Sequence, residues 1–166
     1  MNKYGQRRGQ TGEDLAARLA PLSTLTTIIT RHDAEAIDLL NETANQIGKE
    51  LSKNITTSQI RNVFGAVRMI EQDTKGLDPE ARLPASVHRA LVMLRPKLAY
   101  QYGRISGNPD DPKKAAMGAM TTILSNAIGL VGDSQSNFRN FVDFFEAILA
   151  YHRYHGGQAN EKGGQR

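Results

Sequence analysis

The sequence contains no cysteine. This absence excludes disulfide frameworks, thiolate nucleophiles and cysteine-ligated zinc sites. It agrees with a reducing compartment, and no apolar run with a small-residue cleavage site opens the sequence, so we expect a cytoplasmic protein. Tryptophan is absent and aromatic residues make up only 6% of the 166 residues, while 39% are hydrophobic. That composition suffices for one modest core in a single domain.

The chain also lacks a long, purely apolar run. Residues 115–132 carry no charge. This stretch of 18 residues has the minimum length for a transmembrane helix. However, glycine, threonine, serine and asparagine interrupt them, and the large apolar residues recur at helical spacing. We interpret this stretch as a closely packed soluble helix and expect no membrane association.

Sequence signatures of catalysis are missing as well. There is no Gly-rich phosphate loop, no G-x-S-x-G and no H-E-x-x-H. His152 and His155 have a spacing that suits a metal, but no third ligand is near them, which favours structural histidines. His32 and His88 remain as an acid–base pair for RNA cleavage without a metal, although their spacing does not support it. We therefore expect a non-enzyme with no cofactor and no metal.

Helical periodicity and cap residues predict an all-α fold, a compact bundle of about five helices with disordered N- and C-terminal tails. The predicted helices cover residues 33–52 with Asp33 as N-cap, 57–72, 86–102, 113–131 and 136–155. Pro96 predicts a kink or a restart within the third. The predicted organisation is a flexible N-terminal segment at 1–30, a single helical-bundle domain at 31–155 and a disordered tail at 156–166.

The last predicted helix is the most apolar amphipathic segment. Its stripe is broad enough to lie at the centre of a core or in a subunit contact. It consists of Phe138, Phe141, Val142, Phe145, Ile148 and Leu149.

Positive and negative charges are separated along the chain. The net charge is +4, yet residues 53–104 hold nine Lys and Arg against four Asp and Glu, a balance of +5. Residues 32–52 hold five acidic residues against one lysine. This separation predicts one basic and one acidic surface, and the basic one suits a polyanion.

Two pairs of cations recur at a spacing of seven residues. Arg61 and Arg68 share one flank of the second predicted helix, about 10 Å apart along its axis, and as a pair they favour phosphate binding. Each taken singly is equally consistent with an ion pair to a carboxylate. Lys97 and Arg104 share a flank of the third helix, and Arg95 lies on its other flank. Tyr100 is expected in the core, although an exposed aromatic there would suit base stacking.

Three stretches together resemble the small subunit of type III-A CRISPR effectors, the Csm complex. They are ITTSQIRN from Ile55, LRPKLAYQYGR from Leu94 and FRNFVDFFEAILAY from Phe138. The resemblance implies a small helical bundle that stacks in several copies beside the guide and target RNA and has no nuclease activity. The implied partners are guide RNA, target RNA, other Csm subunits and further copies of the chain, with a dimer as one form in isolation.

The resemblance also implies site residues. Its basic positions carry over onto Arg61, Lys97 and Arg104, and it implies that Thr57 caps a helix and that Tyr100, Gly103, Glu146 and Tyr151 hold the fold. Helical geometry adds Arg95 and two further cations, so the expected RNA-binding residues are Lys53, Arg61, Arg68, Arg95, Lys97 and Arg104. Such cations bind the backbone without reading sequence, because guide pairing supplies recognition.

Two other functions remain open at this point. One is a helical assembly protein whose basic surface pairs only with acidic protein surfaces. The other is a metal-independent ribonuclease that uses His32 or His88.

Overall fold

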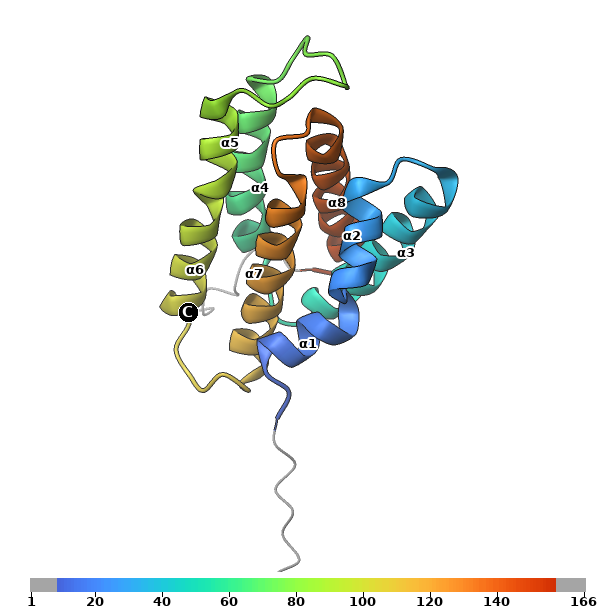
Figure 1. Ribbon diagram of the computed structural model, residues 1–166. Coiled ribbons are helices and arrows are strands. Elements are labelled where there is room, and N and C mark those ends of the chain that lie inside the picture. Colours follow the sequence, from blue (N-terminus) through green and yellow to red (C-terminus); the bar gives the residue numbers. More distant parts are fainter. Residues whose placement is uncertain (1–8, 158–166) are drawn as a thin grey trace, which may run out of the picture.

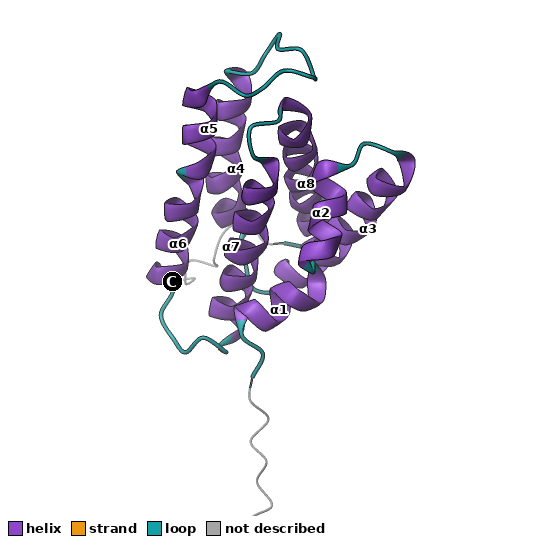
Figure 2. Cartoon of the chain, in the orientation of Figure 1, coloured by secondary structure: helices purple, strands orange, loops and turns teal. Residues whose placement is uncertain are grey.

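The computed structural model describes residues 9–157. Within this range it is all-helical, as predicted, apart from one isolated bridge between Arg82 and Ser134 (Figures 1 and 2). The helices are α1 (Gly12–Leu19), α2 (Leu22–Thr30), α3 (Ala34–Leu51), α4 (Thr57–Gln72), α5 (Ala85–Val92), α6 (Leu94–Arg104), α7 (Pro112–Val131) and α8 (Gln135–Tyr154). The described residues thus hold eight helices rather than about five, because one predicted helix is two and the N-terminal region adds two more.

The prediction of a flexible segment at 1–30 is wrong for residues 12–30, which form α1 and α2. Thr11 and Asp14 form a capping box at the N-terminus of α1. In α2, the side chains of Leu25, Ile28 and Ile29 are fully buried. Short helices are marginal alone and are stabilised here by packing against α7 and α8. The predicted tail is also corrected at its start, since Gly157 is buried. Residues 1–8 and 158–166 lie outside the described residues.

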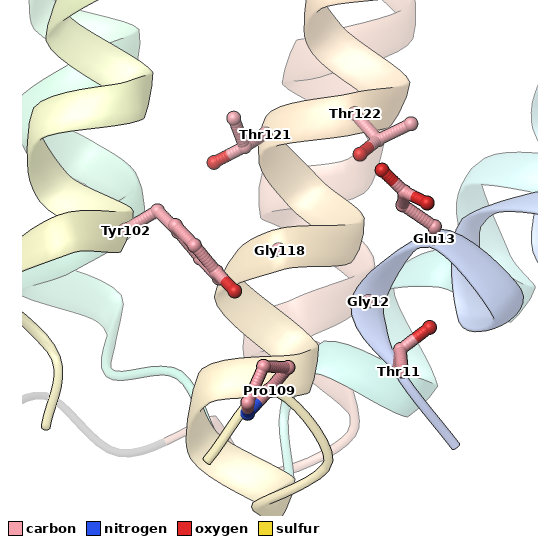
Figure 3. Close-up of a pocket in the computed structure, with 8 residues that line it drawn as sticks. All are labelled: Thr11, Gly12, Glu13, Tyr102, Pro109, Gly118, Thr121 and Thr122. Atoms are coloured by element: carbon pink, nitrogen blue, oxygen red, sulfur yellow. The ribbon is translucent and has the colours of Figure 1, made fainter. Parts of the chain in front are cut away.

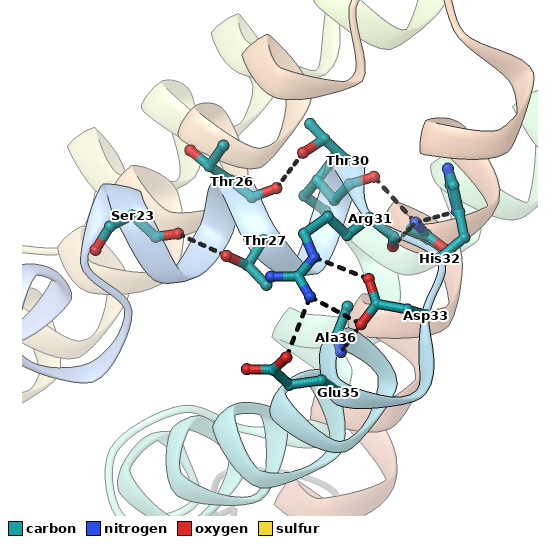
Figure 4. Close-up of polar contacts among 11 residues, drawn as sticks. Ser23, Thr26, Thr27, Thr30, Arg31, His32, Asp33, Glu35 and Ala36 are labelled. Carbon is teal, nitrogen blue, oxygen red and sulfur yellow. Dashed lines mark hydrogen bonds and ion pairs between the residues drawn. The ribbon is translucent and has the colours of Figure 1, made fainter.

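The connection from α2 to α3 is fixed by a polar network (Figure 4). Arg31 donates hydrogen bonds to Asp33 at 2.8 and 3.0 Å and to Glu35 at 3.2 Å. The bond from Arg31 lowers the pKa of Asp33 to about 2. Asp33 also accepts from the backbone of Ala36 and is the N-cap of α3, as predicted. From α8, Asn140 donates to the carbonyl of Ile29 at 3.0 Å, so the end of α2 is also tied to α8.

The core is centred on α7 and α8. The phenylalanines of α8 are completely buried or nearly so, which confirms its predicted place in the core; they are Phe138, Phe141, Phe144 and Phe145. Phe145 packs edge to face on Phe64 of α4, with ring centroids 5.2 Å apart. Figure 1 shows α7 between α6 on one side and α1 with α2 on the other. Within the described residues, no helix is long and apolar enough to cross a membrane.

Two local predictions concern helix starts. The restart near Pro96 is confirmed, because Met93 separates α5 from α6 and Pro96 falls in the first turn of α6, where a missing N–H is tolerated. Thr57 is not the cap of α4: Thr56 is, and it forms a capping box with Gln59. Thr57 is instead buried, and its hydroxyl donates to the carbonyl of Gly157 at 3.3 Å.

Candidate nucleic-acid interface

A polar cleft of about 870 Å³ opens where the α3–α4 connection, the first turns of α4, the end of α6 and the start of α7 meet. Lys53, Arg104 and Lys113 line it, and we call it the basic cleft. Its other polar walls are Asn54, Gln59, Asn62 and Gln101. None of the described residues that line it is acidic. Amide and cationic groups without a carboxylate form a surface suited to phosphates and sugars.

The floor of the basic cleft is held rigidly. The hydroxyl of Thr56 accepts from the backbone of Gln59 at 3.2 Å, and the amide oxygen of Gln59 accepts from the backbone of Thr56 at 2.9 Å. The Nε2 of buried His152 lies 2.7 Å from the carbonyl oxygen of Ile55. Since a carbonyl only accepts, this nitrogen carries the proton. Burial lowers the pKa of His152, so the neutral ring holds the α3–α4 connection in place.

Lys53 and Arg104 are the two predicted residues that the fold brings together. Lys53 reaches the carboxylate of Glu50 at 3.3 Å, and both side chains are partly exposed to solvent. Exposed pairs of this kind contribute little and exchange readily for a stronger anion. The guanidinium carbon of Arg104 lies 5.8 Å from the centroid of the Tyr100 ring, and the side chain makes no ion pair in the described part of the chain.

The expectation that Tyr100 lies in the core is wrong, because the residue is 67% exposed. Leu94 and Leu98 are the buried residues of α6, and Tyr100 falls on the flank that carries Lys97 and Arg104. Gly103, also expected to hold the fold, is exposed and has no atom within 4 Å of a built Cβ. Tyr151 does hold the fold, since its hydroxyl donates to Asn41 at 2.7 Å.

Arg61 and Arg68 differ in their surroundings although they share a flank of α4. Arg68 donates to Glu71 at 2.7 Å and to Glu146 of α8 at 3.0 Å, and it lies over the ring of Phe64. It therefore ties α4 to α8. Arg61 is exposed, makes no ion pair among the described residues, and does not line the basic cleft.

Arg95 and Lys97 also separate. The guanidinium of Arg95 donates twice to the carbonyl oxygen of Ser125, at 3.2 and 2.9 Å, and lies against Gly129 of α7. This side chain packs α6 on α7. Lys97 is exposed and makes no ion pair in the described range. Among the six predicted cations, only Arg61, Lys97 and Arg104 thus have neither an ion pair nor a hydrogen bond to an oxygen of the described residues.

Sequence reasoning missed Lys113, which lines the basic cleft from the first turn of α7. Its place after Pro112, a residue common in the first turn of a helix, puts it at a helix start. No signal in its own neighbourhood linked it to residues 53 and 104, because the contact depends on how α7 packs against α6.

A second pocket, of about 370 Å³, lies between α1 and α7 (Figure 3). Gly12 and Gly118 allow the two helices to approach closely, since a Cβ on Gly12 would lie 2.7 Å from the backbone of Gly118. Glu13, Tyr102, Thr121 and further hydroxyl and apolar groups line it. With a carboxylate as its one charged wall among the described residues, this pocket does not suit a polyanion.

The histidines have structural surroundings. His152 contacts Ile55, as described above, and the Nε2 of His155 lies 2.6 Å from the side-chain oxygen of Asn45. The Nδ1 of His32 lies 2.9 Å from Asn140, and that of His88 lies 2.8 Å from the carbonyl oxygen of Gly132. In residues 9–157 no group of three or more potential ligands is placed to hold a metal ion.

Comparison with known families identifies the chain by most of its length. The family model Csm2 Type III-A matches residues 34–158, which is most of the chain. The matched range begins at α3 and includes every residue of the basic cleft. No curated protein matches the chain.

Proposed function

The chain belongs to the Csm2 type III-A family, and from this premise we propose that it is a non-catalytic small subunit of a type III-A CRISPR ribonucleoprotein effector. In this proposal several copies stack and bind the backbone of guide and target RNA without reading sequence, as part of antiviral defence in the cytoplasm. Its partners are the two RNAs, other subunits of the effector and further copies of itself.

The observation that carries the RNA-binding part is the charge of α5, α6 and their connections. Residues 81–109 contain five Arg and Lys and no Asp or Glu. Two of these cations are engaged elsewhere in the fold: Arg82 pairs with Asp133, and Arg95 bonds to Ser125. Arg89, Lys97 and Arg104 remain exposed. Because complementary pairing between guide and target supplies the sequence specificity, a subunit of this kind needs only backbone affinity.

We propose Arg61, Lys97 and Arg104 as the principal phosphate contacts, and Lys53 and Lys113, which line the basic cleft with Arg104, as further ones. Arg68 and Arg95 are left out of this set because their guanidinium groups already bond to protein oxygens. The six cations predicted from sequence thereby divide into contacts to RNA and contacts within the bundle.

Salt-dependent RNA binding by single variants tests this assignment. We expect Arg61→Gln, Lys97→Gln and Arg104→Gln each to weaken binding to any RNA sequence and to shallow the plot of log K against log salt by about 0.7 per lost contact to a single strand. Lys75→Gln is the matched control, since Lys75 is exposed in the α4–α5 connection, at the far end of α4 from the basic cleft (Figure 1). Normal affinity and slope in the triple variant would refute the assignment.

The alternative is a subunit that makes only protein contacts. The exposed acidic residues of α3, Glu35, Asp38 and Glu42, favour it as a counterpart for the basic surface of another copy. Purification of the tagged chain from its host separates the two functions. Guide RNA and several effector subunits in the eluate support the proposal, whereas copies of the chain with protein partners and no RNA support the alternative.

A further inference from the structure

One aromatic side chain lies on the basic surface with no partner in the core. Tyr100 is 67% exposed, and its hydroxyl makes no hydrogen bond within residues 9–157. Burying an aromatic ring is strongly favourable, so an exposed ring is available for a contact outside the subunit, and its neighbours decide whether it has one.

The neighbours of Tyr100 indicate what that contact is. Lys97, Tyr100 and Arg104 follow at intervals of three and four residues, which places them on one flank of α6. Met93, 48% exposed, extends the same flank by one turn. The guanidinium carbon of Arg104 lies over the Tyr100 ring at 5.8 Å from its centroid. This cation–π contact orients the ring and leaves its opposite face for a second planar group.

The charge of the flank selects among possible partners. From residue 81 to residue 109 there is no carboxylate, so a basic or neutral protein surface would leave Lys97 and Arg104 without compensation. A polyanion compensates both, and among polyanions a nucleic acid also supplies flat rings at the spacing of its phosphates. Exposed aromatics interleaved with cations are the arrangement by which proteins bind single-stranded nucleic acid.

We propose that Tyr100 is a stacking platform for an unpaired nucleobase, and that Lys97 and Arg104 bind the phosphates on either side of that nucleotide. This inference rests on the proposed RNA-binding function and adds to it. Paired guide and target RNA offer only their backbones to this flank. Tyr100 therefore adds a contact with the bases of an unpaired strand, without reading their identity.

The test compares two RNAs of equal length, one a single strand and one a blunt duplex, with the full chain and its Tyr100→Leu variant. In a duplex the bases are stacked on each other and cannot reach Tyr100. We therefore expect Tyr100→Leu to weaken single-strand binding about 5- to 150-fold, the range for loss of one base–aromatic stack, and to leave duplex binding unchanged. Because no charge is lost, the salt slope stays the same, unlike that of Lys97→Gln.

Two controls sharpen the comparison. Tyr100→Phe keeps the ring and is expected to bind like the unaltered chain. Tyr154→Leu removes another highly exposed ring, from α8, and is expected to change neither affinity. Both sites are exposed, and a thermal melt of each variant establishes that it is folded.

The outcomes distinguish a failure of base stacking on Tyr100 from a failure of the proposed RNA binding. If the unaltered chain binds RNA with salt dependence but Tyr100→Leu binds both RNAs as tightly, the stacking platform is refuted and the proposed function stands. Equal losses on both RNAs also refute stacking. If the unaltered chain binds neither RNA at low salt, the proposed function fails and the inference fails with it.

Discussion

Replacing Gly48 by alanine probes a close contact between α3 and α8. Gly48 lies in α3, and a Cβ there would come within 2.6 Å of the backbone nitrogen of His152 and 2.8 Å of the carbonyl carbon of Tyr151 in α8. These atoms belong to a helix backbone, which cannot rotate away as the end of a side chain does. The two helices must therefore separate locally if the methyl group is added.

The expected change in stability follows from two opposing contributions. Overpacking costs about 1–3 kcal/mol, and contact with backbone favours the upper end, whereas the better helix propensity of alanine returns about 1 kcal/mol. The net loss of about 2 kcal/mol corresponds to a melting temperature about 4–8 °C lower for a chain of this size. Thermal unfolding followed by circular dichroism measures it.

Gly65 in α4 supplies the matched control, because a Cβ there meets nothing within 4 Å. Gly65→Ala brings the same gain in propensity without the collision and is expected to raise the melting temperature by about 2–4 °C. The opposite signs of the two substitutions are the test. A Gly48→Ala variant that melts at or above the unaltered chain would show that α3 and α8 are not packed at this distance.

Three further predictions concern the core, a cap and a histidine. Phe145→Ala is expected to lose about 3–5 kcal/mol in chemical denaturation, because the side chain is completely buried; an unchanged midpoint would contradict that burial. Thr56→Ala is expected to lower the free energy of unfolding by about 1 kcal/mol, because Thr56 is the N-cap of α4. An unchanged free energy of unfolding in the same assay would show that Thr56 is not the cap. Burial lowers the folded-state pKa of His152 below 6.5, so the unfolded chain binds the proton more readily. Stability is then full above pH 6.5 and falls as the pH drops below it, and His152→Gln is expected to flatten this part of the stability curve; a variant that keeps the bend would assign it to another group.

The helices with strong periodicity and clear caps were predictable from sequence, and their bounds agree within a few residues for α3, α4, α7 and α8. The two N-terminal helices were not, because α1 and α2 are short and α2 carries five Ser and Thr among its nine residues. Three of those threonines satisfy their hydroxyls on carbonyls one turn back, at 2.6 to 3.3 Å. Such residues read as loop formers in isolation, and only the burial of Leu25 and Ile29 against distant helices makes the segment helical.

Local sequence pattern was also insufficient to predict which cations of the candidate site are free to bind a ligand. The seven-residue spacing correctly predicted that Arg61 and Arg68 share a flank of α4. It carries no information on which side chains of other helices pack against that flank. Arg68 bonds to Glu71 within its own helix, but the carboxylate that joins it to α8 is Glu146, 78 positions away, and the carbonyl that engages Arg95 is 30 positions away. Local pattern therefore yields a set of cations, and tertiary packing decides which of them hold the bundle and which remain for a ligand.

The positions of the acidic helix α3 and the basic helix α6 affect how the subunit orients near a polyanion. Figure 1 shows α3 and α6 on opposite sides of α7 and α8. α7 and α8 thus separate the acidic helix α3 from the acid-free helix α6, although the net charge of +4 suggests only a mildly basic molecule. Near a polyanion, attraction acts on one side and repulsion on the other, so the field turns α6 toward the strand before any specific contact forms. A subunit with the same net charge spread evenly would feel a similar pull and no such torque. If the chain binds the RNA backbone without reading sequence, as we propose, this torque is what selects α6 as the surface that meets the strand.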